Sequence, residues 1–429
     1  MTKKTRNHGE DLRGATRLAL DATLGVMSVV ESMHRTIAAG PAVLGSPLAG
    51  PAKLITGVVY GTLRGVTDLV GSGIDLALTE LAPLLGESEP GPDREAVVSA
   101  LNGVLGDYMV ETGNPLAIEM CLRRDGRPLE LTAEALREAI PDATGRVCVL
   151  VHGSSSTDLQ WKRNGHDHGA ALARDLGVTT VYVRYNSGLH VSTNGRSLAA
   201  LLDALVAAWP VPLEAIDFVA HSMGGLVLRS ALHIAEAEGS AFRARVRKAV
   251  FLGTPHHGAP LERGGVWVPV LLGVSRYSAP LARLGDIRSA GVTDLRYGNV
   301  LDEHWHGRDR FEPGDDPRES LSLPAGVECY AIAATLSREP DAASAEKSTS
   351  AARSRIGEVL RHRLVGDGLV PVDSALGRHA EARLALDFPA ANQLVVWETG
   401  HLDLLDRPAV YDALRAWLSP AARDTATPA

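Results

Sequence analysis

Short apolar runs alternate with amphipathic stretches along most of the chain after residue 95. The runs have the length of buried strands, and the amphipathic stretches repeat their apolar positions every three to four residues, as helices do. The predicted strands are residues 147–151, 178–185, 215–219, 246–253, 327–333 and 393–397, and the predicted helices are residues 95–108, 168–176, 197–209, 226–237 and 408–418. Such alternation predicts an α/β fold with a mostly parallel sheet and helices on both of its faces.

The same pattern predicts how the sheet begins and where it is interrupted. Residues 116–122 and 127–131 flank Asp125-Gly126, a hairpin signal that predicts two antiparallel strands at the start of the sheet. The alternation stops between residues 258 and 324, where apolar stretches are mixed with charged, turn-rich sequence. An insertion of this length between two strands is expected to form a cap over a functional site.

Residues 1–86 form a region of their own, which is helical in pattern. Gly57, Gly61 and Gly65 stand four apart in its second helical stretch, so that one face is bare enough for another helix to approach closely. Charged residues in the same stretch argue against a membrane-spanning helix. We expect these helices to pack on each other or on the main domain, or else to attach to a lipid or other apolar surface. A linker at 87–94, a main domain at 95–418 and a disordered tail at 419–429 complete the predicted organisation.

Composition and charge narrow the choice of partners and of compartment. The 429 residues are 45% hydrophobic and 22% charged, as in a globular protein, and the formal net charge is −8. This acidic balance, without a basic stripe, argues against a nucleic-acid partner. Cys121, Cys148 and Cys329 are far apart in apolar runs, which indicates buried thiols rather than a disulfide framework. No cleaved signal peptide is predicted. We therefore expect a cytoplasmic protein, with peripheral membrane contact through the N-terminal helices as an alternative.

One short motif stands where a predicted strand meets a predicted helix. Residues 220–225 read AHSMGG, with a serine at 222 and a small residue two positions away on either side. A serine on a sharp strand-to-helix turn is the nucleophile elbow of the α/β-hydrolase fold, in which the crowded backbone tolerates only small neighbours. Gly224 meets that need, and Ala220 replaces the usual first glycine. The motif predicts Ser222 as a catalytic nucleophile.

A serine nucleophile needs a base and an orienting acid, which follow it in the order Asp/Glu, then His, in this fold. His401 lies directly after the last predicted strand and is the predicted base. The predicted acid is Asp367, which lies between two glycines in a loop that joins the last two predicted strands. Asp403 and Asp373 are rival candidates for this role.

The backbone N–H groups that would stabilise a developing oxyanion are predicted from the same two strand ends. One belongs to Met223, directly after the nucleophile, and the other to Ser154, in the loop after the strand at 147–151. His256 and His257 border this region and are expected to be structural or to line a pocket. The pairs His166/His168 and His304/His306 have metal-ligand spacing but lack further ligands, so no metal and no cofactor is expected.

Five motifs, in order along the chain, resemble a known group of enzymes. They are LVHG at 150–153, AHSMGG at 220–225, LGTPHHG at 252–258, GDGLVP at 366–371 and GHLDL at 400–404. Over roughly residues 145–418 the chain resembles bacterial lipase/esterase-type α/β-hydrolases of the GPI inositol-deacylase-like group. The resemblance implies the same triad of Ser222, Asp367 and His401, and it does not fix the substrate.

The motifs lead to one expected activity and two alternatives. We expect a serine hydrolase that cleaves carboxylic esters, acyl or lipid esters above all, through an acyl-enzyme intermediate. The alternatives are an acyltransferase or thioesterase with the same triad, and a surface-attached protein in which catalysis is secondary.

Overall fold

The computed structural model describes residues 92–259, 289–308, 316, 318–319, 321–339 and 366–420. The predicted N-terminal helices therefore lie outside the described residues, as do most of the tail that was predicted to be disordered and much of the predicted cap. Among the described residues, no helix combines the length and the apolar composition that crossing a bilayer requires.

Ten strands and eight α-helices are described in this part of the chain. The strands are β1 (Cys121–Arg124), β2 (Arg127–Pro128), β3 (Arg146–Val151), β4 (Lys162–Arg163), β5 (His166–Asp167), β6 (Thr179–Arg184), β7 (Ala215–His221), β8 (Val246–Leu252), β9 (Glu328–Ala334) and β10 (Gln393–Val396). The helices are α3 (Pro92–Glu111), α4 (Ala133–Ala139), α5 (His168–Leu176), α6 (Val191–Ala208), α7 (Met223–Glu238), α10 (Ala290–Asp294), α12 (Val372–Ala375) and α13 (Pro408–Leu418).

Eight of these strands form one sheet, in the order β10-β9-β8-β7-β3-β6-β1-β2. The strands from β10 to β6 in that order are parallel, whereas β1 is antiparallel to both β6 and β2. Asp125 and Gly126 turn the β1–β2 hairpin with φ of 52° and 71°, as a type I′ turn requires. The mostly parallel sheet and its antiparallel start confirm the prediction, although both hairpin strands are shorter than expected.

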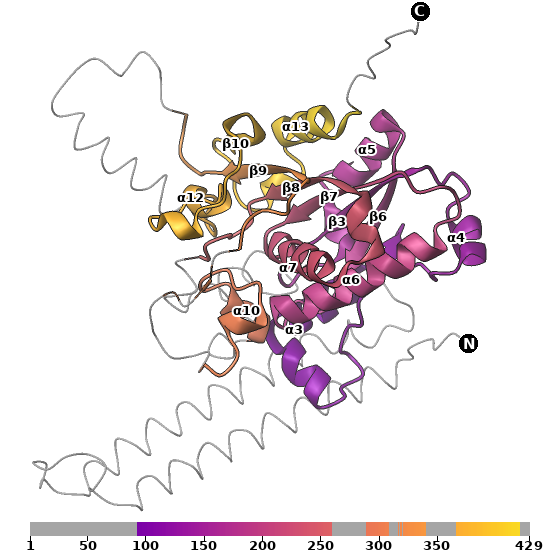
Figure 1. Ribbon diagram of the computed structural model, residues 1–429, viewed down its shortest axis with the longest axis horizontal. Coiled ribbons are helices and arrows are strands. Elements are labelled where there is room, and N and C mark those ends of the chain that lie inside the picture. Colours follow the sequence, from indigo (N-terminus) through magenta and orange to yellow (C-terminus); the bar gives the residue numbers. More distant parts are fainter. Residues whose placement is uncertain are drawn as a thin grey trace, which may run out of the picture.

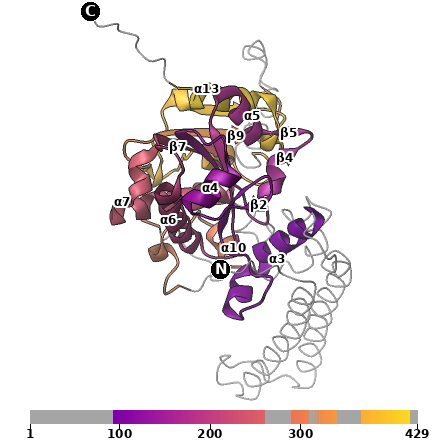
Figure 2. The same cartoon turned by 90° about the vertical axis from the view of Figure 1, so that its right-hand side faces the viewer.

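Helices cover the two faces of the sheet, with α5 and α13 on one face and α6 and α7 on the other (Figures 1 and 2). The period of two along β3 explains this arrangement, because successive side chains of a strand point to opposite faces. Val147, Val149 and Val151 enter the core that α6 and α7 share. Cys148 and Leu150 enter the core that α5 and α13 share. Each fully buried aliphatic side chain stabilises the fold by about 1.5–3 kcal/mol relative to an exposed one.

A buried ion cluster fastens α3 to the antiparallel end of the sheet. The carboxylate of Glu95 lies 3.1 Å from a guanidinium nitrogen of Arg123 on β1 and 2.8 Å from one of Arg184 on β6. Arg123 also pairs with Asp158 at 2.8 Å. Because all four side chains are mostly withdrawn from water, each charge depends on its partners to offset the cost of desolvation.

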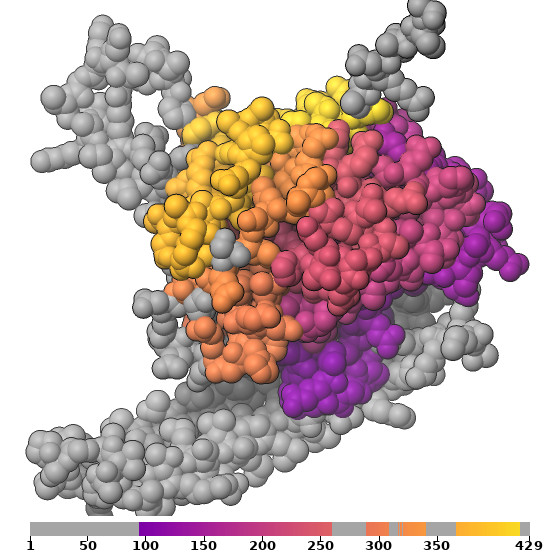
Figure 3. Space-filling view, in the orientation of Figure 1, coloured from indigo at the N-terminus to yellow at the C-terminus, as the bar shows by residue number. Residues whose placement is uncertain are grey.

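The described part of the predicted insertion packs on the main domain. The orange surface in the space-filling view, which includes residues 289–308, borders the pink and red surface of α6 and α7 (Figure 3). The Ser289 hydroxyl donates to the Gly103 carbonyl of α3 at 2.6 Å, and the Asp294 carboxylate accepts from the Val191 N–H at the start of α6 at 2.9 Å. Residues 260–288 and 309–315 are not among the described residues, so the cap itself stays a prediction.

The structure departs from the predicted elements where tertiary contacts compensate for a weak local pattern. Helix α6 begins at Val191, six residues before its predicted start, because its polar first turn is buried against the loop before it and α10. Helix α4 was not predicted, although Thr132 caps it by accepting from the Ala135 N–H at 3.2 Å. Cys121 is only partly buried, whereas Cys148 and Cys329 are buried, and all three are free thiols.

Candidate active site

Ser222 lies on a sharp turn between β7, which ends at His221, and α7, which begins at Met223. Its φ of 54° and ψ of −127° are rare for a residue with a side chain and cost about 1–3 kcal/mol of backbone strain. Its N–H donates to the Leu252 carbonyl of β8 at 2.8 Å, which fixes the turn to the neighbouring strand. This geometry confirms the predicted strand–turn–helix motif.

Two glycines let the backbone close tightly around this turn. A Cβ on Gly224 would lie 2.4 Å from the His152 carbonyl oxygen, closer than any real Cβ approaches an oxygen. A Cβ on Gly153 would lie 2.9 Å from the Ser222 Cβ and 3.2 Å from Nδ1 of His221. The loop after β3 therefore runs directly against the elbow, as the oxyanion prediction requires.

Asp367 and His401 form a buried hydrogen-bonded pair from two loops that follow β9 and β10. Nδ1 of His401 and Oδ2 of Asp367 are 2.7 Å apart, and the two side chains are 4% and 1% exposed. The other carboxylate oxygen accepts from the backbone N–H groups of Leu369 and Val370, at 3.0 and 2.8 Å. The His401 N–H donates to the Asp367 carbonyl at 3.1 Å. These contacts fix the carboxylate and the imidazole relative to each other.

The pair is held beside the elbow by the residue that precedes the serine. Nε2 of His221 lies 3.1 Å from the His401 carbonyl oxygen, and the two imidazole rings are 4.7 Å apart between centroids. Gly253 lies against the pair, since a Cβ there would be 3.2 Å from both Asp367 Oδ2 and His401 Cε1. It directly follows Leu252, whose carbonyl accepts from the Ser222 N–H. The structure thus brings the three predicted triad residues to one edge of the sheet. Nε2 of His401 is buried and has no hydrogen-bond partner among the described residues.

The predicted oxyanion donors are also at this edge. Met223 is the first residue of α7, where a backbone N–H has no acceptor within its own helix, and in the described part of the chain the Ser154 N–H donates to no backbone acceptor. Two hydrogen bonds hold the loop that carries Ser154. The Tyr185 hydroxyl donates to the His152 carbonyl at 2.9 Å, and the Ser155 N–H donates to the Ser187 hydroxyl at 2.9 Å. Two such N–H groups, held in place before any reaction, are suited to stabilise a negative oxygen.

Two further histidines at the site remain neutral around pH 7. Burial, followed by the neighbouring His401, lowers the pKa of His221 well below its usual range. Burial also lowers the pKa of His152 to about 4, and its ring stacks on Tyr185 with centroids 4.4 Å apart. A neutral His221 donates from Nε2 to the His401 carbonyl, so it holds His401 in place. This contact was not predicted, although a histidine directly before the serine was a signal for it.

The rival acids lie away from the His401 ring. The side chain of Asp403 is 44% exposed and accepts from the Gly400 N–H at 3.0 Å and from Arg163 at 3.1 Å. Asp373 pairs with Arg378 at 3.6 Å, and its side chain is 36% exposed. Asp367 is therefore the carboxylate that contacts His401.

The other histidines that the sequence singled out make contacts within the fold. His256 and His257 are buried, and burial lowers the pKa of His257 to about 3. His166 and His168 share a hydrogen bond of 2.8 Å, and Nδ1 of His304 accepts from the Val300 N–H at 3.2 Å. Among the described residues, no three His, Cys, Asp or Glu side chains are grouped as metal ligands.

Comparison with known proteins gives one family match and several distant structures. Residues 124–285 match the model of a domain of unknown function, DUF7379. This matched range includes Ser222 but ends before Asp367 and His401. No curated protein sequence matches the chain.

Three similar solved structures illustrate the level of likeness. The mature lipase BlEst2 of Bacillus licheniformis is 18% identical, with 70% of this chain and 98% of that chain covered and a TM-score of 0.41. The phospholipase PlaB of Legionella pneumophila is 14% identical, with 54% and 45% covered and a TM-score of 0.34. The lipase of Staphylococcus hyicus is 13% identical, with 64% and 92% covered and a TM-score of 0.33. These values are too low to support an argument about activity.

The architecture can be named from the chain's own geometry. The sheet is mostly parallel with an antiparallel start, helices cover both faces, and a strained serine stands on the strand–turn–helix elbow between β7 and α7. An acid and a histidine follow the serine on loops after later strands. The described residues therefore have the α/β-hydrolase fold.

Proposed function

We propose that this protein is a serine hydrolase of carboxylic esters, with acyl or lipid esters as its substrates. The observation that carries the proposal is the 2.7 Å hydrogen bond between Asp367 and His401, on loops that His221 ties to the strained turn at Ser222. A free Nε2 on a buried, oriented imidazole next to a serine elbow is the arrangement that activates a hydroxyl nucleophile.

Each group has one role in the proposed reaction. The Ser222 hydroxyl attacks the ester carbonyl and gives its proton to Nε2 of His401, while Asp367 stabilises the imidazolium through Nδ1. The N–H groups of Met223 and Ser154 stabilise the oxyanion. His401 then protonates the departing alcohol and later deprotonates the water that releases the carboxylic acid from Ser222.

The decisive experiment compares two serine-to-alanine variants, one at the turn before α7 and one within α7. A fluorophosphonate probe should label the wild type and leave Ser222→Ala unlabelled. Ser230→Ala is the matched control, because Ser230 is fully buried on α7 and its hydroxyl has no partner in the described part of the chain. We expect the control to be labelled like the wild type. Equal labelling of wild type and Ser222→Ala would refute the proposal.

Substrate class is tested with a panel of esters of increasing acyl length on the wild type and Ser222→Ala. The apolar stretches in the sequence of the predicted cap, residues 258–324, favour esters with long acyl chains. Faster turnover of long-chain than of acetyl esters would agree with it, and equal turnover would contradict it. The same machinery serves acyl transfer and thioester cleavage, which product analysis with added alcohols or with thioester substrates distinguishes.

A further inference from the structure

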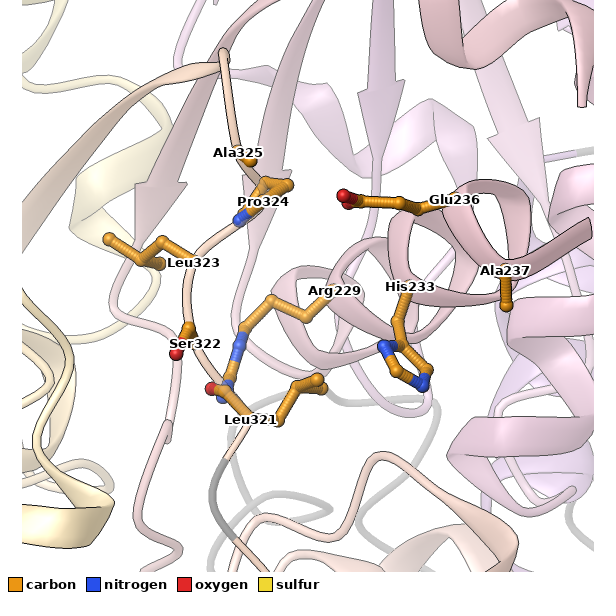
Figure 4. Close-up of a pocket in the computed structure, with 9 residues that line it drawn as sticks. All are labelled: Arg229, His233, Glu236, Ala237, Leu321, Ser322, Leu323, Pro324 and Ala325. Carbon is orange, nitrogen blue, oxygen red and sulfur yellow. The ribbon is translucent and has the colours of Figure 1, made fainter. Parts of the chain in front are cut away.

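A pocket lies beside α7, away from the proposed reaction centre. It has a volume of about 420 Å³ and lies between the second half of α7 and the segment that leads into β9 (Figure 4). Its lining residues are Arg229, His233, Glu236, Ala237, Leu321, Ser322, Leu323, Pro324 and Ala325. Arg229 follows Ser222 by seven residues, or about 10 Å along the helix axis. The pocket therefore begins about two helical turns beyond Ser222.

Arg229 is a buried cation with few partners. It is 6% exposed, and its side chain extends from α7 toward Leu321 (Figure 4). One Nη donates to the Leu321 carbonyl at 2.9 Å, and the other lies 3.5 Å from Nδ1 of His256. Nε has no hydrogen-bond partner among the described residues. A guanidinium has five N–H donors, so three of those on Arg229 are left without an acceptor there.

The charge of Arg229 is not balanced by the described residues. None of their carboxylates forms an ion pair with it, and the neighbouring guanidinium of Arg318 pairs with Asp316 at 2.7 Å. Cys329 is the acid that lies close enough to influence Arg229, and burial raises the pKa of this thiol to about 12, which keeps it neutral. Burial and the charge of Arg318 lower the pKa of Arg229 to about 9, so Arg229 is still charged at neutral pH.

An unpaired buried cation destabilises a fold, whereas a bound anion offsets the cost of its desolvation. We propose that this cavity binds a monovalent carboxylate with an apolar tail, the carboxylate at Arg229 and the tail along Leu321–Ala325. A carboxylate matches the planar donor pair of a guanidinium. Leu321, Leu323 and Pro324 supply an apolar wall for the tail.

The negative charge of Glu236 favours a carboxylate over a more highly charged anion as the ligand of this pocket. Its side chain lines the same cavity, and its carboxylate lies 3.3 Å from Arg243, which balances its charge. A dianion such as a phosphate monoester would place a second negative charge near Glu236 without a second free cation to offset it. A monoanion leaves the cavity close to neutral.

The test measures binding by calorimetry to the full chain that carries Ser222→Ala, so that no turnover occurs. Octanoate is the probe, and octanol, acetate and octyl phosphate are the comparison ligands. We expect octanoate to bind at least tenfold more tightly than each of them. Octanol as tight as octanoate would overturn the role of charge, acetate as tight would overturn the role of the tail, and octyl phosphate as tight would overturn the choice of a monoanion.

Two variants locate the binding. Arg229→Met removes the cation with little change in volume, and Ala237→Leu narrows the cavity but keeps the cation. Each should weaken octanoate binding at least tenfold, whereas Arg174→Met, which removes a 71% exposed arginine elsewhere, should not change it. Unchanged affinity in Ala237→Leu would overturn the proposal even if Arg229→Met failed to fold. Because the measurement needs no catalysis, it stands whether or not the proposed ester hydrolysis is found.

Discussion

Replacing Asp367 by asparagine tests the proposed triad at its least exposed contact. The amide keeps the oxygen that accepts from the N–H groups of Leu369 and Val370, at 3.0 and 2.8 Å. Alanine would leave both buried donors unpaired, at about 1–3 kcal/mol each, so asparagine is the cleaner change. What asparagine alters is the atom that faces Nδ1 of His401, now 2.7 Å from a carboxylate oxygen.

The expected magnitude follows from the tautomer of the base. An amide NH₂ facing Nδ1 donates to it, which places the imidazole proton on Nε2, and His401 can then no longer accept the proton of Ser222. The same substitution in another serine hydrolase lowers kcat about 10⁴-fold. We therefore expect Asp367→Asn to lower kcat by about 10³–10⁴-fold, or about 4–5.5 kcal/mol in the activation free energy.

The assay is steady-state hydrolysis of a short-chain p-nitrophenyl ester, with thermal unfolding to show that the fold is intact. Asp403→Asn is the matched control, because Asp403 is the 44% exposed rival on the same loop as His401 and contacts Gly400 and Arg163 rather than the imidazole. We expect its kcat to fall less than tenfold. If Asp403→Asn lost activity and Asp367→Asn kept it, the assignment of the acid would be wrong.

Three further changes test the site and the fold around it. Gly153→Ala places a Cβ 2.9 Å from that of Ser222, so we expect at least a 100-fold loss of esterase activity and a free energy of unfolding lower by about 1–3 kcal/mol; activity within tenfold of wild type would contradict this. His152 has a pKa of about 4 in the fold and about 6.5 when unfolded, so the unfolded chain binds the extra proton and stability falls as pH drops from 6.5 toward 4. In urea unfolding between pH 7 and 5, His152→Phe should make that decline shallower by up to about 1.4 kcal/mol per pH unit, and an equal slope would refute the reasoning. Glu95→Gln leaves the buried guanidinium of Arg184 without its carboxylate at 2.8 Å, and we expect unfolding to become easier by about 3–5 kcal/mol; a change below 1 kcal/mol would show that the cluster is not balanced as described.

Local sequence determined the elements and the elbow of this protein. Strands β3, β7 and β8 each contain an apolar run because both faces of a parallel sheet are buried, and that signal needs no tertiary information. The small residues around Ser222 predicted its turn for the same reason, since the steric demand of the elbow is local. The positions of Asp367 and His401 after the last predicted strands, in the order acid and then histidine, were also enough to select them as candidates.

Tertiary structure decided which of these candidates meet. Asp403 follows His401 by two residues in the sequence, whereas Asp367 and His401 are 34 positions apart, and only the folded loops place the Asp367 carboxylate 2.7 Å from the imidazole. The contact of His221 with the His401 carbonyl joins residues 180 positions apart, which no periodicity encodes. The same holds for the unbalanced charge of Arg229, because whether a cation has a counter-ion depends on which distant segments pack around it. Periodicity and sterics act between neighbours in the chain, whereas hydrogen-bond geometry and desolvation act between neighbours in space.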